Sequence, residues 1–377
     1  MRSSIRLLWT VAAMTAAALV AGAAPAQAST GGGEDRNAVF VQTNDPHGNA
    51  IAAYHREADG TLTLSAIYRT GGFGGRTAGS ASDPLASQGS LVLVRSQALL
   101  LAVNAGSDTI SVFRVAGDNL RLNQVIDSGG EFPTGFAVHG NLVYVLDAGG
   151  QGHVSGFRIS GGRLHAIADS TRSLRLGNTT PPFFLTAPAQ VGFTPDGRHL
   201  IVTTKTNNTV DVFSIGAEGR LSAQPVSNAE AAVPFAFVFD GAGRMVLNFA
   251  GTSSLETFTV NANNTLTPVS APASDGQVAL CWVTSAHGFE YAANTGSNNV
   301  SEFKIGSNGS VSLINATAAS NIPGAIDIAS AGGRFLYVDS GPSSSVYAFQ
   351  IGAGGALTAI QVAHVPDGGD LEGIAAI

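Results

Sequence analysis

Residues 190–226 read QVGFTPDGRHLIVTTKTNNTVDVFSIGAEGRLSAQPV, and this stretch predicts one antiparallel sheet of four short strands. The turn residues Asp196-Gly197 and Glu218-Gly219 suit the tight hairpins that join the first and last strand pairs. A small polar loop, Lys205 to Asn208, separates the second strand from the third. The expected strands are Gln190 to Thr194, Leu200 to Thr204, Val210 to Ile215 and Leu221 to Val226.

The same unit recurs along the chain with a period near 45 residues, lengthened by insertions in the first and third intervals. Each copy carries an aromatic residue in its third strand and an apolar residue seven or eight positions later that opens the fourth. The aromatic residues are Tyr54, Phe113, Phe157, Phe213, Phe258, Phe303 and Phe349. Seven copies of a hairpin-rich unit of this length predict the blades of a β-propeller. A solenoid with free ends is the alternative.

The two ends of the chain indicate how the ring closes. Blade one has strands at Ala38 to Thr43, Ile51 to Arg56 and Thr61 to Tyr68, but no innermost strand of its own. The chain ends with Leu371 to Ile377, which matches the start of a unit, and pairing it with blade one would hide two sheet edges. The sequence therefore predicts an all-β fold, a seven-bladed β-propeller of four-stranded antiparallel blades closed by the C-terminal strand in blade one.

The N-terminus resembles an export signal. Arg2 and Arg6 precede an apolar run from Leu7 to Val20, and Ala26-Gln27-Ala28 follows as a small-x-small cleavage site. We expect a signal peptide at residues 1–28, a flexible N-terminal segment at 29–37 and the propeller at 38–377. The mature protein is then secreted or extracytoplasmic, with no membrane span after cleavage. An uncleaved anchor helix is the alternative, although the run is short for a membrane span.

Composition excludes several classes of function. The chain has 19 basic and 26 acidic residues, a net charge of −7 that becomes −9 without Arg2 and Arg6, and these charges are dispersed, so nucleic acid is not an expected partner. Cys281 is the only cysteine, which rules out an intrachain disulfide. The histidines are scattered without a zinc-ligand spacing, and no Gly-x-Ser-x-Gly stands at a strand-to-helix turn. No cofactor is expected.

The loops that follow the second strands and the long connections between blades should emerge on one face of the ring, where we expect a small-molecule site at the channel mouth. The candidate substrate-binding residues at the second-strand ends are Asn104, Asp147, Lys205, Asn294 and Asp339. Lys205 is the one cation in this set. It could bind a carboxylate or polarise a carbonyl, or it could neutralise neighbouring acids.

Two insertions could contribute further ligand-binding residues. The segment Gly71 to Gly89 contains Arg76 and Gln88 and is expected to form a lid or wall of the site, or surface filler. The segment Ser170 to Pro188 combines Arg172 and Arg175 with Phe183-Phe184, which suits an anionic, partly apolar ligand. In the alternative, the two phenylalanines cap the core and the arginines lie in solvent.

Acidic residues outside the strands supply candidates for catalysis. Glu131 and Glu230 precede blades three and five near the same mouth, and either could act as a general base, although a solvated loop glutamate is the common case. The tail residues Asp367, Asp370 and Glu372 could bind a hard cation through oxygen ligands. They lack the spacing of a calcium-binding loop.

The units resemble those of the bacterial seven-bladed propeller lactonases, relatives of 6-phosphogluconolactonase and carboxymuconate cyclase. Phe193-Thr194-Pro195-Asp196-Gly197 is similar to a turn of that family, and Leu336-Tyr337-Val338 with Val346-Tyr347-Ala348-Phe349 is similar to its strand pair. The resemblance extends over residues 38–377. It implies a lactone-hydrolysing or isomerising enzyme acting on a small lactone or a carboxylate-bearing sugar acid.

The resemblance also identifies where this chain departs from the family. Active members carry a histidine, an arginine-histidine pair and a glutamate at places that correspond here to Ala189, Phe235-Ala236 and Phe249. Lys205 is the residue that matches a family position. Two functions therefore stay open: a lactonase-like hydrolase, in which Lys205 and Arg172 bind the substrate carboxylate and a glutamate activates water, and a non-catalytic binding propeller for a ligand or a partner protein.

Overall fold

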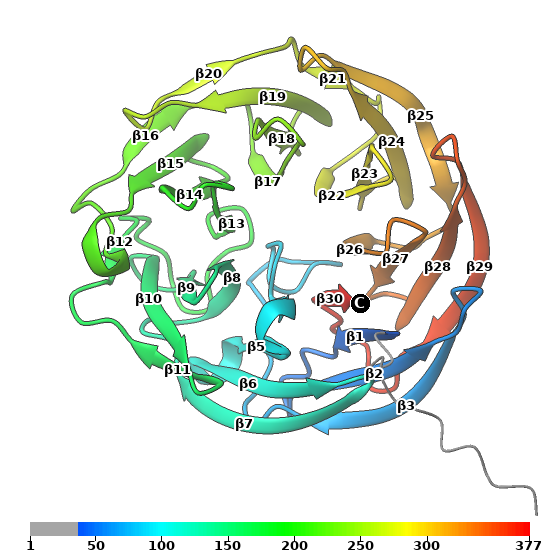
Figure 1. The fold of residues 1–377 in the computed structure, drawn as a ribbon, viewed down its shortest axis with the longest axis horizontal. Helices are drawn as coiled ribbons and strands as arrows, with labels where there is room; N and C mark the ends of the chain where they lie inside the picture. The colour runs from blue at the N-terminus through cyan, green and yellow to red at the C-terminus, as the bar shows by residue number, and fades with distance from the viewer. Residues whose placement is uncertain (1–36) are drawn as a thin grey trace, which may run out of the picture. The chain divides into compact units, whose positions relative to one another are not determined.

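The computed structural model describes residues 37–377, which form a ring of seven antiparallel sheets around a central axis (Figure 1). The sequence-based prediction of an all-β, seven-bladed propeller is confirmed. The helices in these residues are three short 3₁₀ turns: η1 (Arg95–Gln97), η2 (Ala105–Ser107) and η3 (Ala217–Gly219). No helix in this part of the chain has the length and apolar character needed to cross a membrane. The predicted signal peptide lies outside the described residues.

Each blade has its innermost strand at the axis and its fourth strand at the rim. From inner to outer strand, blade one consists of β30 (Ile374–Ala376), β1 (Ala38–Gln42), β2 (Ala50–Arg56) and β3 (Leu62–Arg69), and blade two of β4 (Leu91–Val94), β5 (Leu99–Asn104), β6 (Thr109–Ala116) and β7 (Asn119–Asp127). Blade three consists of β8 (Pro133–His139), β9 (Leu142–Asp147), β10 (His153–Ser160) and β11 (Arg163–Ala166). Blade four consists of β13 (Pro188–Phe193), β14 (His199–Thr204), β15 (Thr209–Ser214) and β16 (Val226–Ala229).

Blades five to seven follow the same order. They are β17 (Pro234–Phe239), β18 (Met245–Phe249), β19 (Ser254–Val260) and β20 (Leu266–Pro268); β22 (Leu280–Ala286), β23 (Phe289–Asn294), β24 (Asn299–Ile305) and β25 (Val311–Ser320); β26 (Ala325–Ala331), β27 (Phe335–Ser340), β28 (Ser345–Ile351) and β29 (Leu357–His364). Two-residue strands extend the rims of blades three and five: β12 (Arg172–Ser173) pairs with β10, and β21 (Ala273–Ser274) pairs with β19.

The C-terminal strand closes the ring in blade one, as the sequence predicts. β30 pairs antiparallel with β1, with Ala376 opposite Val39 and Ile374 opposite Val41. The ladder extends past both ends of β30, because the N–H of Gln42 donates to Gly373 O at 2.9 Å and the N–H of Ile377 donates to Ala38 O at 2.9 Å. The inner edge of β1 is therefore paired rather than open to another chain.

The fourth strand of blade four does not lie where the sequence predicts it. It runs from Val226 to Ala229, and Leu221 forms only an isolated bridge with Ile215. Pro225 has no N–H to donate to a ladder, so regular pairing begins one residue after it. The outer strand therefore begins five residues later in the chain than predicted.

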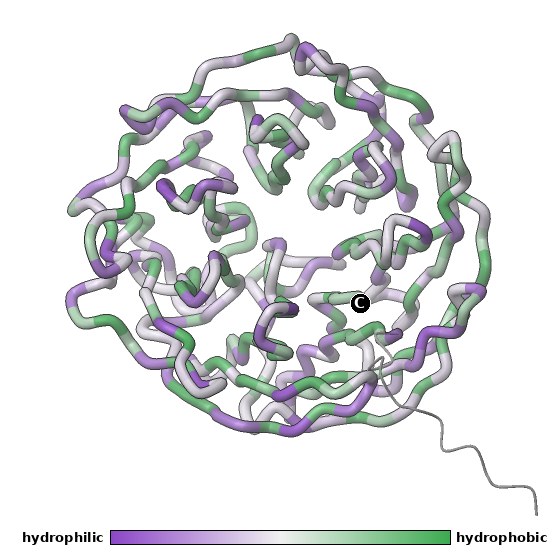
Figure 2. Tube along the Cα trace, viewed as in Figure 1, coloured by the Kyte–Doolittle hydropathy of each residue, from purple (hydrophilic) through white to green (hydrophobic). Residues whose placement is uncertain are grey.

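Burial decreases from the axis to the rim. The second strand β5 is buried at every position, because the faces of its sheet pack against both neighbouring blades. The outermost strand β25 is mostly exposed or half-buried. The alternation of polar and apolar residues along the outer strands can be followed in Figure 2. Apolar packing between blades therefore supplies the main stabilisation of a ring whose only cysteine, Cys281, is free.

A repeated tyrosine hydrogen bond joins neighbouring blades. The third residue of the second strand is tyrosine in blades three, six and seven, and its hydroxyl donates to a glycine carbonyl in the outer turn of the next blade. The pairs are Tyr144 with Gly219 at 2.8 Å, Tyr291 with Gly355 at 2.5 Å and Tyr337 with Gly60 at 2.9 Å. Each bond satisfies a buried polar group while it fixes the position of one blade against the next.

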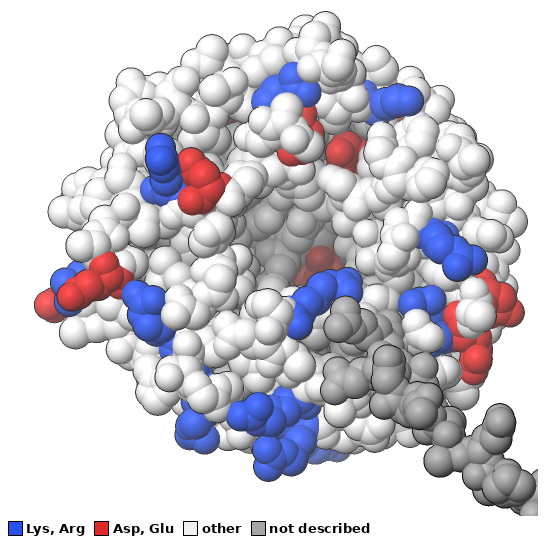
Figure 3. Space-filling view, viewed as in Figure 1, with Lys and Arg blue, Asp and Glu red and all other residues white. Residues whose placement is uncertain are grey.

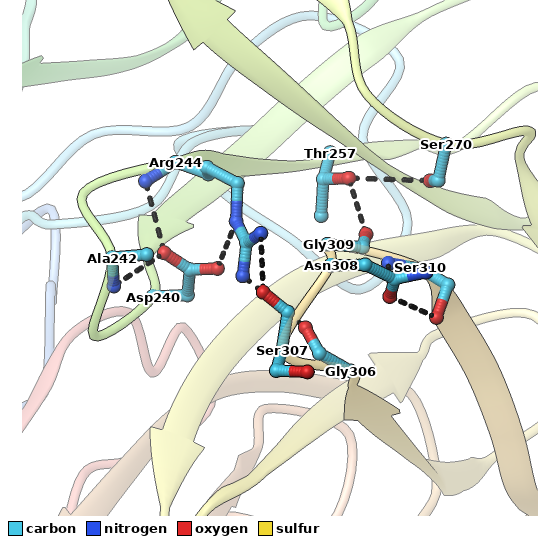
Figure 4. Close-up of polar contacts among 10 residues, drawn as sticks. All are labelled: Asp240, Ala242, Arg244, Thr257, Ser270, Gly306, Ser307, Asn308, Gly309 and Ser310. Carbon is cyan, nitrogen blue, oxygen red and sulfur yellow. Dashed lines mark hydrogen bonds and ion pairs between the residues drawn. The ribbon is translucent and has the colours of Figure 1, made fainter.

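Blade five has Leu247 at this position and uses an arginine instead (Figure 4). The Arg244 guanidinium donates to the carbonyls of Ser307 at 3.0 Å and Gly306 at 3.2 Å in the outer turn of blade six. Asp240 holds the guanidinium in place through an Nε–Oδ2 contact of 2.7 Å. Blade five is thereby attached to blade six without a tyrosine.

Candidate functional site

The second-strand ends predicted from the sequence do lie at one end of their strands, but not at one register position. Asn104, Asp147 and Asn294 are the last residues of their strands and pair with the first residue of the third strand. Lys205 follows the last residue of β14, and Asp339 precedes the last residue of β27. Lys205 and Asp339 therefore each stand one residue away from the register position of the other three, and successive residues of a strand point to opposite faces.

The two asparagines are engaged by their own blades. Asn104 Nδ2 donates to Ser111 Oγ at 2.8 Å, and Asn294 Nδ2 donates to Ser301 Oγ at 2.8 Å. Both side chains are fully buried. They fix the loop between the second and third strands, so their amide donors are already used within the protein.

The two aspartates at these ends are buried carboxyl groups. Burial raises the pKa of Asp147 to about 8, with a smaller contribution from Asp108. Burial also raises the pKa of Asp339 well above its ordinary value, and Asp327 adds to the effect. At neutral pH the Asp147 carboxyl group therefore holds a proton.

The insertion Gly71 to Gly89 enters the centre of the ring. Its last part, residues 84–89, is here named the central loop, and its residues Leu85, Ala86 and Ser87 are at most 1% exposed. The central loop is hydrogen-bonded to blades three, four and six and to the closing segment, through Ser87 with Thr134, Phe136 with Gly89, Gln88 with Ala189, Trp282 with Ser87, Val283 with Gln88 and Leu85 with Glu372. Gln88, predicted as a substrate-binding residue, has its amide paired with the backbone of Val283.

The ring is hollowed at its centre on the face drawn in Figure 3, with acidic side chains inside the hollow and other charges scattered around the rim. A cavity of about 450 Å³ lies at the second-strand ends of blades four, five and six, and residues of both insertions line it. Its lining includes Asp83, Phe184, Lys205, Phe235, Cys281 and Trp282. Its volume falls in the range of roughly 300–1,000 Å³ that is typical of small-molecule sites.

Lys205 is the cation of this cavity and is 2% exposed. Its Nζ donates to the carbonyl of Ala86 in the central loop and lies 5.2 Å from the ring centroid of Phe235. Ala86 and Phe235 both line the cavity, so the ammonium is at its wall. Burial lowers the pKa of Lys205 to about 8, an effect that Asp83, Cys281 and Glu372 partly offset.

Acidic groups gather on one side of Lys205. Asp83 lines the cavity, and its carboxyl group lies beside that of Glu372. Burial raises the pKa of Asp83, and Lys205 partly counteracts this effect. The pKa of Glu372 is raised well above its ordinary value by burial first and then by Asp83. Asp327 continues the cluster, and its pKa is raised by burial and by Asp83.

Cys281 stands at the wall of the cavity but is not a nucleophile in its ordinary state. Burial raises the pKa of its thiol above the usual range, and Asp83 adds to the shift. The thiol is therefore protonated at neutral pH, and the thiolate is the reactive form.

The second insertion contributes an aromatic wall and no cation. Phe184 lines the cavity. Phe183 is 43% exposed and packs edge-on against Phe184, with the two ring centroids 4.8 Å apart. Arg172 is bound to the backbone, with its guanidinium nitrogens 2.8 Å from Leu221 O and 2.9 Å from Ser222 O.

The other predicted arginines also lie outside the cavity lining. Arg175 is exposed. Arg76 pairs with Asp370 and donates to Ser80 O. The structure therefore brings Lys205 to the cavity and leaves the three arginines outside its lining.

The two glutamates predicted as general bases do not line the cavity either. Glu131 is exposed, and its carboxylate accepts a hydrogen bond from Thr180 at 2.5 Å. Glu230 ends blade four, where burial raises its pKa to about 7 and Glu256 adds to the shift. Among residues 37–377 no group of three or more His, Cys, Asp or Glu side chains is arranged to hold a metal ion, and the tail acids Asp367, Asp370 and Glu372 form no such group.

Sequence reasoning missed Asp83, Glu372 and Trp282 as members of the site. Asp83 lies in an insertion without repeat equivalents, and Glu372 comes from the closing segment at the other end of the chain. The available signal for Glu372 was its position just before β30, since the first strands of the blades border the axis.

The sequence and the fold match known proteins as follows. Residues 151–281 match the family described as "Lactonase, 7-bladed beta-propeller". No curated protein matches the chain. The fold is similar to that of the periplasmic gluconolactonase of Pseudomonas aeruginosa, with 17% identity, a TM-score of 0.65 and coverage of 90% of this chain and 99% of that one.

Two further structures share the architecture. A protein from Lactobacillus plantarum has 17% identity and a TM-score of 0.67, over 88% of this chain and 96% of that one. Virginiamycin B lyase from Staphylococcus aureus has 10% identity and a TM-score of 0.50, over 72% and 82%. At these identities the likeness shows the fold alone. Residues 151–281 therefore match a family of propeller lactonases, and the whole ring has the fold of a seven-bladed β-propeller.

Proposed function

We propose that this protein binds and hydrolyses a small lactone in the cavity at Lys205. The observation that carries the proposal is a buried ammonium at the wall of an apolar cavity. An ammonium has three N–H donors, and Ala86 O is the acceptor found for it. No carboxylate oxygen of the described residues lies within 4.0 Å of Lys205 Nζ. A ligand carbonyl or carboxylate would supply the Lys205 ammonium with a further hydrogen-bond acceptor.

In this proposal Lys205 stabilises charge and Asp83 moves a proton. Water attacks the carbonyl carbon of the lactone and gives its proton to the carboxylate of Asp83, while Lys205 donates to the oxygen that becomes negative. The ring C–O bond then breaks, and Asp83 returns the proton to the departing oxygen. The product is a hydroxy acid, whose carboxyl group releases its proton to bulk water and then pairs as a carboxylate with Lys205. Burial raises the pKa of the Asp83 carboxyl group, which makes its carboxylate a stronger base than an exposed one.

A second candidate function is binding without catalysis. The places of the family's histidine, arginine-histidine pair and glutamate are taken by residues that cannot transfer protons, and Ala189, Ala236 and Phe249 are fully buried. In this candidate the cavity holds its ligand, or the same face engages a partner protein, and no bond is broken.

We propose an extracytoplasmic location for either activity. The support is the leader-like sequence of residues 1–28, with Arg2 and Arg6, the apolar run that follows them and the small-residue cleavage site. The proposed chemistry needs water and two side chains, so no cofactor is part of it.

The test is a lactone-hydrolysis panel on the wild-type chain, Lys205→Met, Asp83→Asn, Glu230→Gln and Lys304→Met. Lys304 is the matched control because it is the only other lysine, also stands over a phenylalanine ring, and is exposed. We expect at least tenfold losses of turnover in Lys205→Met and Asp83→Asn and none in Lys304→Met.

Each other outcome has one meaning. Full activity in Lys205→Met would remove this cavity as the active site. Activity lost in Glu230→Gln but kept in Asp83→Asn would move the base to Glu230. Lys205-dependent ligand binding without hydrolysis of any lactone in the wild type would establish the binding candidate.

A further inference from the structure

The exposed surface of the cavity is mainly aromatic and aliphatic. Its hydroxyl side chains are Ser80, Ser82 and Thr295, of which Ser80 donates to Asp83 O and Thr295 donates to Ala325 O. Phe235 and Trp282 pack against each other at an interplanar angle of 60°, with their ring centroids 5.1 Å apart, and Phe184 lines the cavity from the second insertion. The indole N–H of Trp282 is already used, because it donates to Ser87 O at 3.2 Å. Trp282 therefore offers a ligand only the surface of its ring. Leu185 and Val233 extend the same apolar lining.

The charged groups at the cavity are one cation and a cluster of acidic side chains beside it. Lys205 is the single Lys or Arg side chain in its lining, and Asp83 is the single carboxylate. Arg172 is bound to backbone carbonyls and Arg76 to Asp370, so the two insertions bring no second cation. A phosphate group carries up to two negative charges and three acceptor oxygens, which one ammonium beside a carboxylate cannot satisfy.

Ligands with several sugar hydroxyl groups should also bind weakly in this cavity. Each hydroxyl moved from water into an apolar site without a hydrogen-bond partner lowers affinity, and a lactone derived from a sugar acid carries several. A flat hydrocarbon ring gains instead, because Phe235, Trp282 and Phe184 bury it and edge-to-face contacts with them are favourable.

We propose that the cavity selects an aryl- or alkyl-substituted lactone, and the hydroxy acid formed from it, over polyhydroxylated and phosphorylated sugar lactones. The ring of the ligand lies against Phe235, Trp282 and Phe184, and its carbonyl or carboxylate oxygen accepts from Lys205. The hydrolytic half of this statement rests on the proposed function, whereas the preference in binding does not.

The experiment uses the full chain carrying Trp9→Phe, which leaves Trp282 as the only fluorophore of its kind. Fluorescence titrations compare 3-(2-hydroxyphenyl)propanoate, the acid derived from dihydrocoumarin, with gluconate and 6-phosphogluconate. We expect the aryl acid to bind at least tenfold more tightly than either sugar acid. Lys205→Met should abolish most of this binding, and Lys304→Met should leave it unchanged.

A second variant pair tests the aromatic wall. Phe184→Ser should weaken binding of the aryl acid at least fivefold, and Phe73→Ser should not, because Phe73 is 51% exposed and lies outside the cavity lining. An equal effect of both variants, or tighter Lys205-dependent binding of 6-phosphogluconate than of the aryl acid, would overturn the proposed preference.

Hydrolysis assays on dihydrocoumarin and glucono-δ-lactone separate this inference from the proposed function. Tight aryl-acid binding without hydrolysis of either lactone would sink the proposed function and keep the binding preference. Lys205-dependent hydrolysis of the sugar lactone alone would keep the proposed function and overturn the preference. No Lys205-dependent binding of any of the three acids would also overturn it.

Discussion

The ammonium nitrogen of Lys205 lies 5.2 Å from the ring centroid of Phe235. Lys304, the other lysine of the chain, stands over Phe289 at 5.1 Å. The two nitrogen-to-centroid distances are nearly the same, but Lys205 is buried and Lys304 is exposed. Any difference in the behaviour of these two lysines therefore reports burial and the cavity rather than the cation–π contact itself.

We expect Lys205 to lower the stability of the protein without a bound ligand. A buried cation without a carboxylate partner is unfavourable, and methionine keeps most of the aliphatic stem without the charge. We expect Lys205→Met to raise the free energy of unfolding by about 1–2 kcal/mol, and Lys304→Met to change it by less than about 0.5 kcal/mol. Urea denaturation measures both. A Lys205→Met protein less stable than Lys304→Met would show that the charge is satisfied within the protein.

Ligand binding should depend on the protonation of Lys205. Its pKa is lowered to about 8, so the side chain is charged below that pH and neutral above it. The affinity for a carboxylate ligand should hold steady from pH 6 to about pH 7.5 and then fall about tenfold for each pH unit above the pKa. Fluorescence titrations at several pH values check this. The residual binding in Lys205→Met should show no such step, and a step that persists there would assign the titration to another group.

The buried carboxyl groups should make the protein more stable in mild acid than in mild base. The pKa of Asp147 is raised to about 8, above its value in the unfolded chain, so its contribution is fully present below about pH 4 and is lost as the pH rises toward 8. We expect unfolding at pH 5 to require more energy than at pH 8.5, by an amount on the order of a few kcal/mol.

Two substitutions test the source of this pH dependence. Asp147→Asn keeps the shape of the protonated carboxyl group without its titration and should shrink the difference between pH 5 and pH 8.5. Asp367→Asn is the control, because Asp367 is exposed. Equal pH dependence in wild type and Asp147→Asn would remove Asp147 as a cause.

Removal of residues 371–377 should open the ring. The deletion exposes the inner edge of β1 and removes the Glu372 carboxylate that accepts from Leu85 N–H at 3.0 Å. We expect aggregation or the loss of a single cooperative unfolding transition, observed by size-exclusion chromatography and calorimetry. A chain extended by a short tag after Ile377 is the control and should unfold like the wild type. A truncated protein that stays monomeric and equally stable would contradict the closure as a source of stability.

The interblade tyrosine bond should be measurable in one substitution. Tyr291→Phe leaves the carbonyl of Gly355 without its donor in a buried place, which should cost about 1–2 kcal/mol of unfolding free energy. Tyr68→Phe, at a half-buried rim position, serves as the control and should cost less. Equal costs would mean that the hydroxyl of Tyr291 is as well satisfied by water as by Gly355.

The fold could be predicted from the sequence because the same pattern of strands and turns recurs in each blade. Closure was readable for the same reason, since Leu371 to Ile377 matches the start of a unit. The fourth strand of blade four was misplaced because the apolar Leu221 has the right spacing, whereas the backbone of Pro225 decides where pairing begins.

The site was only partly readable. Lys205 stood out because it breaks a repeated pattern at a strand end. Asp83 and the central loop have no repeat equivalents, so nothing in the sequence indicates that residues 84–89 turn inward rather than over the surface. The proximity of Asp83 to Glu372 depends on closure of the whole ring, which brings together positions nearly 300 residues apart.

The hydrogen bond from the Leu85 N–H to Glu372 also sets an order of assembly. During synthesis Lys205 is made long before Glu372, and the central loop cannot find its partners in blades three, four and six until those blades exist. The cavity is therefore among the last parts of the molecule to be completed. We therefore expect a nascent chain, which already holds Lys205, Asp83 and Phe235, to bind its ligand only after synthesis has passed Glu372.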